Sequence, residues 1–194
     1  MEHLIFNQRG ARLLAHAGPP RQLATGFFFT EGPVWDSATN TLFFTDFAAC
    51  AIHAVRPGGR PRLFRGNSGR AVGLSMTREG VLVAAETASH AVCLARRECS
   101  EVIAGRYDGK PFNSPNDVVV RRDGSVYFTD PYSVAMNGPR EQGFNGFFRV
   151  PFRGGAYGEP VLLGSMERPN GLAFSKDERL LYVDHESKKP IAKY

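Results

Sequence analysis

Three residues with oxygen-bearing side chains, Glu31, Asn116 and Asn170, stand at the same place in three copies of a repeated motif. If the copies are equivalent units around an axis, these side chains point at one common place. Carboxylate and amide oxygens are the ligands that hard divalent cations prefer. The sequence therefore predicts one divalent ion bound by these three residues, with Ca²⁺ as the first choice and Mg²⁺, Mn²⁺ or Zn²⁺ as alternatives. A second interpretation is that these residues only form turns at the starts of strands.

The motif itself occurs four times, and each copy holds an apolar run, a turn and a second apolar run that ends on an acidic residue. The first and last residues are 14 positions apart in three copies and 15 in the first copy, whose turn is read as one residue longer. The copies run from Glu31 to Asp46, from Val72 to Glu86, from Asn116 to Asp130 and from Asn170 to Asp184. Repeats of about 40–50 residues made of short strands are typical of β-propeller blades.

The predicted fold is therefore an all-β propeller in a single domain, residues 1–194, with about four blades of which the last is incomplete. Turn residues such as Asp123-Gly124 separate the apolar runs, as in β-hairpins, and no helical period is sustained. The predicted segments are N-terminal strands in 1–25 (11–17 and 22–25), blades in 26–66, 67–104 and 105–164, and an incomplete blade in 165–194. The longest irregular stretch, 131–145, is predicted to be a loop above the axis.

Further polar residues lie near the predicted metal site. Asn113 and Ser114 precede Asn116 and are predicted to bind a substrate hydroxyl, whereas Asp117 either contacts substrate or caps the strand. The aspartates at the ends of the copies recur with Thr45 and Thr129, which favours hydrogen bonding between blades. The five histidines show no spacing that suggests a catalytic triad, so no catalytic residue is assigned.

Composition excludes several other classes. The net charge of +5 comes from scattered basic residues without interleaved aromatics, which argues against nucleic-acid binding. No stretch approaches the ~20 apolar residues of a membrane span, and the N-terminus shows no signal peptide. Three cysteines without a paired spacing favour reduced thiols and hence a cytoplasmic protein. Nothing in the sequence fixes the oligomeric state.

Four short segments together resemble the gluconolactonase, senescence marker protein and luciferin-regenerating enzyme family, which is regucalcin-like. The resemblance runs from about residue 20 to 184. The segments are Glu31-Gly-Pro-Val-Trp35, Phe112-Asn-Ser-Pro-Asn-Asp117, Tyr127-Phe-Thr-Asp-Pro131 and Pro169-Asn-Gly-Leu-Ala-Phe-Ser175.

This resemblance implies a six-bladed propeller with one catalytic divalent metal in its channel, and hydrolysis of sugar lactones such as gluconolactone. It makes Glu31 and Asn170 metal ligands, and Asn116 a ligand of the metal or of the substrate beside it. A further aspartate, proposed in the family as general base, is expected after residue 194, so the chain is expected to be C-terminally truncated, and whether it is active alone is left open. The alternatives are a non-catalytic metal-binding or interaction propeller, and an organophosphate or ester hydrolase on the same scaffold.

Overall fold

The computed structural model describes residues 12, 19, 21–132, 140–185 and 192–193. Four antiparallel sheets follow one another along the chain. The first sheet holds β1 (Thr30–Asp36), β2 (Thr41–Asp46), β3 (Ala51–Val55) and β4 (Arg62–Arg65). The second holds β5 (Ala71–Met76), β6 (Leu82–Glu86), β7 (Ala91–Ala95) and β8 (Ser100–Ala104). The third holds β11 (Val118–Val120), β12 (Val126–Asp130), β13 (Gly146–Val150) and β16 (Val161–Ser165). The fourth holds β17 (Pro169–Phe174), β18 (Leu181–His185) and β19 (Ala192–Lys193).

Two small hairpins stand outside these sheets. Their strands are β9 (Arg106–Tyr107) with β10 (Lys110–Pro111), and β14 (Phe152–Arg153) with β15 (Ala156–Tyr157). No helix among the described residues is long and apolar enough to cross a bilayer. The predicted loop 131–145 lies largely outside the described residues, because 133–139 are not among them.

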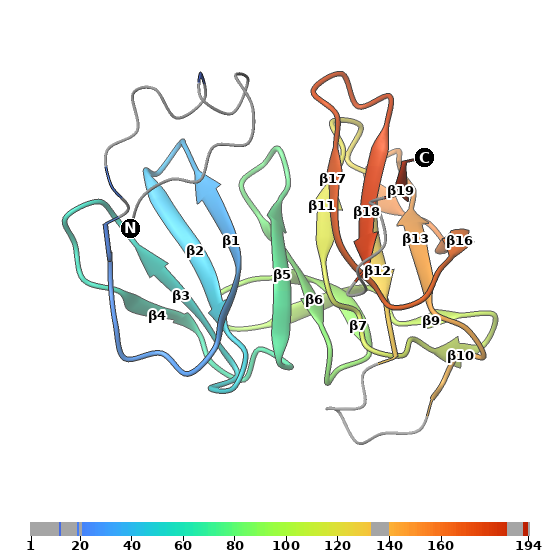
Figure 1. Ribbon diagram of the computed structural model, residues 1–194, viewed down its shortest axis with the longest axis horizontal. Coiled ribbons are helices and arrows are strands. Elements are labelled where there is room, and N and C mark those ends of the chain that lie inside the picture. Colours follow the sequence, from blue (N-terminus) through green and yellow to red (C-terminus); the bar gives the residue numbers. More distant parts are fainter. Residues whose placement is uncertain (1–11, 13–18, 20, 133–139, 186–191, 194) are drawn as a thin grey trace.

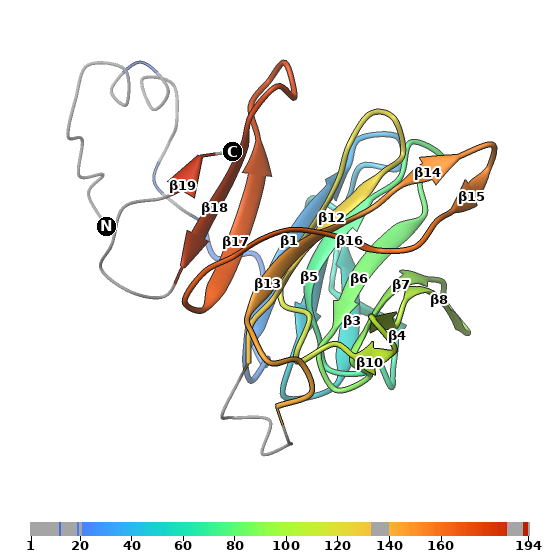
Figure 2. The same cartoon turned by 90° about the vertical axis from the view of Figure 1, so that its right-hand side faces the viewer.

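The four sheets are arranged as blades around a common axis (Figures 1 and 2). The first strand of each sheet is the innermost one, and β1 contacts β5, β5 contacts β11, and β11 contacts β17. The predicted all-β propeller with an incomplete fourth blade is thus confirmed. The predicted blade boundaries stay a prediction; β16 ends at Ser165, one residue after the boundary predicted at 164.

Apolar side chains fill the spaces between neighbouring blades. Ile52 and Leu74 belong to the cluster between the first two blades, and Val83 and Phe128 to the cluster between the second and third. The rings of Phe112 and Phe128 meet edge to face with centroids 4.9 Å apart, a favourable aromatic geometry. Because every strand pairs within its own sheet, this packing between sheets is what holds the inner strands at fixed positions.

Two of the recurring threonines form hydrogen bonds between blades, whereas the aspartate next to the first of them does not. Thr45 Oγ1 donates to the Val72 carbonyl of the second blade at 3.0 Å, and Thr129 Oγ1 donates to the Asn170 carbonyl of the fourth at 2.6 Å. Asp46 instead accepts backbone N–H groups of residues 28 and 29, which lead into its own blade. The prediction of blade-to-blade bonding is confirmed for the threonines and is wrong for this aspartate. Both of its carboxylate oxygens already accept hydrogen bonds from the segment that leads into its own blade.

The fourth blade also has a longer turn than the sequence pattern indicated. Asp46 pairs with Thr30 and Glu86 with Ala71, but the residue that pairs with Pro169 is His185 and not Asp184. The turn between β17 and β18 is residues 175–180, one residue longer than the turn 121–125 between β11 and β12. A one-residue change in register exchanges the faces of a strand. Asp184 therefore takes the place that Thr45 and Thr129 hold in their blades.

The N-terminal prediction is wrong where it can be compared with the structure. Residues 22–25, predicted to be a strand, have no strand structure and belong to none of the sheets formed by the described residues. The segment is held by its side chains instead, because the Phe27 ring packs edge-on against Phe44, with centroids 4.9 Å apart. The other predicted strand, 11–17, lies outside the described residues except for residue 12.

Candidate metal and substrate site

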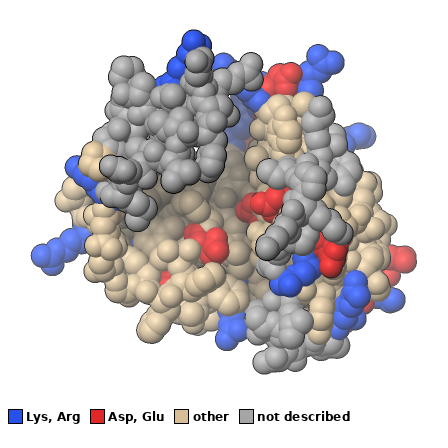
Figure 3. All heavy atoms as spheres, in the orientation of Figure 1, with Lys and Arg blue, Asp and Glu red and all other residues tan. Residues whose placement is uncertain are grey.

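A cavity of about 460 Å³ opens where the starts of the four innermost strands meet. Figure 3 shows the molecule hollowed between the first sheets and the last, with acidic side chains inside the hollow. The residues that line the cavity come from all four blades. They are residues 31–33 of β1, 72–75 of β5, 116–119 at the start of β11, and 170–174 of β17. The repeat thus brings equivalent positions of distant segments to one place.

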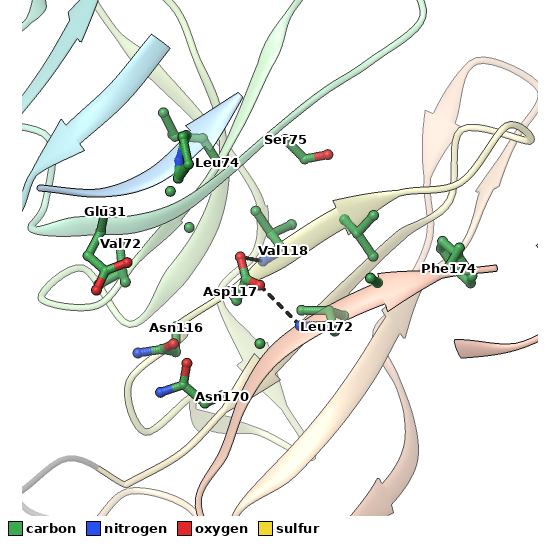
Figure 4. A pocket seen from close by; sticks show the side chains of 16 residues that line it. Glu31, Val72, Leu74, Ser75, Asn116, Asp117, Val118, Asn170, Leu172 and Phe174 are labelled. Carbon is green, nitrogen blue, oxygen red and sulfur yellow. Dashed lines mark hydrogen bonds between the residues drawn. The ribbon is translucent and has the colours of Figure 1, made fainter. Parts of the chain in front are cut away.

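The three predicted metal ligands all line this cavity. Glu31 lies in β1, Asn116 two residues before β11, and Asn170 in β17, and all three are half-buried. Figure 4 shows their side chains directed into the same space. Among the described residues, no hydrogen bond or ion pair engages the Glu31 carboxylate or the Asn116 side-chain amide. These two groups are therefore available to a ligand.

Asp117 stands where the other blades have a glycine, since the residues that follow Glu31, Val72 and Asn170 are Gly32, Gly73 and Gly171. Its Oδ1 accepts the backbone N–H of Val118 at 2.8 Å, and its Oδ2 accepts the N–H of Leu172 in the next blade at 3.1 Å (Figure 4). Its pKa is raised from 3.8 to about 6, mainly by burial and also by the carboxylates of Asp184 and Glu31, while the two hydrogen bonds lower it in part. Asp117 thus lines the cavity and also ties the third blade to the fourth.

Gly73 explains how the second and third blades approach so closely. Its N–H donates to the Asn116 carbonyl at 2.8 Å. A Cβ at this position would lie 2.4 Å from Asp117 Oδ1 and 2.9 Å from the Asn116 carbonyl oxygen. Any side chain here would therefore push the third blade away from the cavity.

Asn113 and Ser114, predicted to bind substrate, do not line the cavity. Both are buried, with 2% and 3% of their surface exposed. The Asn113 Oδ1 accepts the N–H of Gln142 at 2.9 Å, and its Nδ2 donates to the Phe144 carbonyl at 2.9 Å. Both ends of this amide are satisfied within the protein, which argues against the predicted substrate contact. The sequence could not reveal this, because the partners come from a segment about 30 residues away.

Asp130 holds this buried segment in place. Its two carboxylate oxygens accept the backbone N–H groups of Asn113 and Ser114 at 2.9 and 2.7 Å. Its pKa is raised from 3.8 to about 7, because the effect of burial outweighs the lowering by these two bonds and the nearby His90. A carboxyl with a pKa raised on folding stabilises the fold at low pH, and that stabilisation is lost as pH rises through the folded pKa.

We therefore expect Asp130 to contribute a fall in the free energy of unfolding as pH rises from about 4 to about 7. Asp130→Asn replaces the carboxyl with an amide that does not titrate, so the variant loses this contribution to the slope. Urea unfolding of both proteins at several pH values measures the two slopes. The expected result is a shallower fall for the variant, and parallel curves would contradict the assignment.

The donor set fits a hard divalent cation. Glu31, Asn116 and Asn170 can offer one carboxylate and two amide oxygens, and the carboxylate of Asp117, which lines the same cavity, interacts electrostatically with those of Asp184 and Glu31. The described residues contain no group of three or more His, Cys, Asp or Glu that could hold a metal, so a metal site at this cavity would depend on the amide oxygens of the two asparagines. Oxygen donors of this kind suit Ca²⁺ or Mg²⁺.

Comparison with known proteins defines the class of protein to which these blades and this cavity belong. Residues 29–194 match the family model of the SMP-30/Gluconolactonase/LRE-like region, and the chain belongs to this family. The chain is 30% identical over 203 residues to a gluconolactonase of Zymomonas mobilis subsp. mobilis (strain ATCC 31821 / ZM4 / CP4). That match covers 94% of this chain and 56% of the relative, so the chain spans little more than half of the relative's length.

Solved structures show the same fold. A gluconolactonase from Xanthomonas campestris superposes with a TM-score of 0.78 at 28% identity, covering 86% of this chain and 57% of that one. A calcium-binding protein, regucalcin from Agrobacterium tumefaciens, gives a TM-score of 0.68 at 17% identity, covering 87% of this chain and 54% of that one. The second likeness bears on the fold alone, and it agrees with a β-propeller.

Proposed function

We propose that this chain contributes the first part of a metal-dependent lactonase site, which opens sugar lactones by hydrolysis. Two findings support the proposal: membership of the gluconolactonase-like family, and the meeting of Glu31, Asn116 and Asn170 at one cavity. The second carries it, because three blades contribute one oxygen-bearing side chain each to a single space. A cavity of about 460 Å³ also lies within the usual range of small-molecule sites.

Each proposed ligand has a distinct role. The Glu31 carboxylate supplies the negative charge that attracts a divalent cation, while Asn116 and Asn170 supply neutral oxygens, so a bound ion keeps a net positive charge. Such an ion polarises a lactone carbonyl and lowers the pKa of water. Asp117 holds Leu172 of the next blade and presents its carboxylate at the cavity wall. We propose that it positions the sugar hydroxyls.

The ion and the compartment are part of the same proposal. Ca²⁺ is the first choice because all three donors are oxygens, with Mg²⁺, Mn²⁺ and Zn²⁺ as alternatives.

A cytoplasmic location is supported by the three cysteines, Cys50, Cys93 and Cys99, which carry free thiols. The partner that we propose is a small sugar lactone, with no role for nucleic acid or a membrane surface.

The test is a hydrolysis assay on the 194-residue chain, with glucono-δ-lactone as substrate and the spontaneous opening rate subtracted. Metal-stripped protein is compared with protein given each of the four ions, and calorimetry measures binding of the same ions. Turnover above background that needs the ion, and that Asn170→Ala removes, supports the proposal. Ion binding without turnover contradicts hydrolysis by this chain and favours a metal-binding propeller, whereas turnover of a fluorophosphate ester alone favours the organophosphate hydrolase.

A further inference from the structure

Thr129 joins the two segments that carry the asparagines at the cavity. This residue lies in β12 and is completely buried. Its backbone carbonyl accepts the N–H of Asn116 at 2.9 Å. Its Oγ1 accepts the N–H of Asp117 at 3.1 Å and donates to the carbonyl of Asn170 at 2.6 Å. One side chain thus links the start of β11 in the third blade to β17 in the fourth.

Further bonds hold the backbone just after Asn170. The N–H of Gly171 donates to Asp184 Oδ1 at 2.6 Å, and the N–H of Leu172 donates to Asp117 Oδ2 at 3.1 Å. Asn170 is therefore held on its carbonyl side by Thr129 and on its following side by two carboxylates. With its backbone fixed in this way, the Asn170 side chain projects into the cavity at a fixed place relative to Asn116.

Thr45 forms the corresponding bond between the first and second blades, but the residue that it holds carries no proposed ligand. Its Oγ1 donates to the Val72 carbonyl at 3.0 Å, and it is completely buried as well. Val72 has no oxygen-bearing side chain to offer to an ion. Both threonines therefore fasten neighbouring blades, and Thr129 is the one of the two that fastens two proposed ligands to each other.

We propose that Thr129 is a positioning residue that sets the separation of the Asn116 and Asn170 amides and thereby the ion preference of the site. This inference rests on the proposed function, because it requires that the two amides share an ion. Removal of the Thr129 hydroxyl takes away the hydrogen-bond donor of the Asn170 carbonyl. The fourth blade can then shift relative to the third. Mg²⁺ demands near-ideal short octahedral geometry, whereas Ca²⁺ tolerates longer and more varied distances. Mg²⁺ binding is therefore more sensitive to Thr129 than Ca²⁺ binding.

The experiment measures Ca²⁺ and Mg²⁺ binding by calorimetry for the whole chain and three variants, with the melting temperature of each metal-free protein alongside. Thr129→Val keeps the shape and removes the hydroxyl, Thr129→Ser keeps the hydroxyl, and Thr45→Val is the matched control. For Thr129→Val we expect affinity to fall by roughly 10–100-fold, as for other groups that orient metal ligands, and more for Mg²⁺ than for Ca²⁺. Thr129→Ser is expected to keep the affinity of the unmodified chain for both ions. Thr45→Val is expected to lower the melting temperature without changing the affinity for either ion.

Three results would overturn the inference. Unchanged affinity in Thr129→Val shows that the hydroxyl does not position the ligands. An equal loss in Thr45→Val shows that loosened blades, and not this residue, weaken binding. Absence of ion binding by the unmodified chain contradicts the proposed function itself, and this inference with it. If the valine variant does not fold, Thr129→Ala removes the same hydroxyl with a smaller side chain and is measured in its place.

Discussion

Replacement of Glu31 by glutamine is expected to lower the affinity of this chain for divalent ions by more than about 100-fold. Loss of a group that only orients a metal ligand costs up to about 100-fold, and loss of the ligand itself should cost more. Glu31 is the one carboxylate among the three proposed ligands, and the amide of glutamine cannot replace its charge. The substitution keeps the shape of the side chain and breaks no hydrogen bond within the described residues. The metal-free protein should therefore melt at the same temperature or a higher one, because the change also removes the repulsion between the carboxylates of Glu31 and Asp117. Calorimetric titration with Ca²⁺ and thermal unfolding with and without the ion measure both effects.

The control for this prediction is Glu159→Gln. Glu159 is exposed and lies away from the cavity, so the same chemical change there should leave ion binding intact. Ion binding by Glu31→Gln as strong as that of the unmodified chain would falsify the assignment of Glu31 as a ligand. A lower melting temperature without metal would instead show that Glu31 supports the fold.

Glu86→Ala is expected to cause the largest loss of stability, about 3–5 kcal/mol, because it leaves a buried charge without its partner. The carboxylate of Glu86 accepts a hydrogen bond from Arg65 Nη1 at 2.9 Å, and the two side chains expose only 4% and 9% of their surface. Ser89 and Ser100 also donate to this carboxylate, at 3.0 and 2.9 Å. For a chain of this size the expected drop in melting temperature is roughly 10 °C. Urea unfolding and differential scanning calorimetry measure it.

An exposed ion pair in the same blade provides the control. Arg96 and Glu101 approach to 3.9 Å with 51% and 62% of their side chains exposed, so Glu101→Ala should cost less than about 1 kcal/mol. The double variant Arg65→Met with Glu86→Leu should be more stable than Glu86→Ala, because neither charge is then buried alone. A small effect of Glu86→Ala, equal to that of Glu101→Ala, would show that the pair is more hydrated than its burial indicates.

The repeat made the inner part of the molecule predictable. Glu31, Asn116 and Asn170 occupy equivalent positions, so equal spacing in the sequence placed them at one cavity without any knowledge of the packing. The assignment of Asn113 failed for the opposite reason. Its amide is satisfied by Gln142 and Phe144 from a segment with no counterpart in the other copies, and a contact of that kind leaves no periodic signal.

The roles of Thr129 and Asp184 could be predicted only in part. The recurrence of a threonine before the aspartate indicated bonding between blades, but not that its partner is the residue carrying a proposed ligand. The fourth copy has the same apparent spacing as two others, yet its longer turn moves His185 into the position of the acidic residue. Turn length is set by local backbone geometry, which residue types alone do not fix.

The extra residue in the turn between β17 and β18 shows how the blades can diverge. Since each blade closes its own hydrogen-bond ladder, a length change in one turn moves one strand and leaves its neighbours in register. In the fourth blade a carboxylate, that of Asp184, stands at a junction where the first and third blades have a hydroxyl, and the imidazole of His185 stands at the place of the acidic residue. The first blade spans the same number of residues from Thr30 to Asp46 as the fourth does from Pro169 to His185, so blades of equal length can present different chemistry beside the channel while each keeps its own ladder.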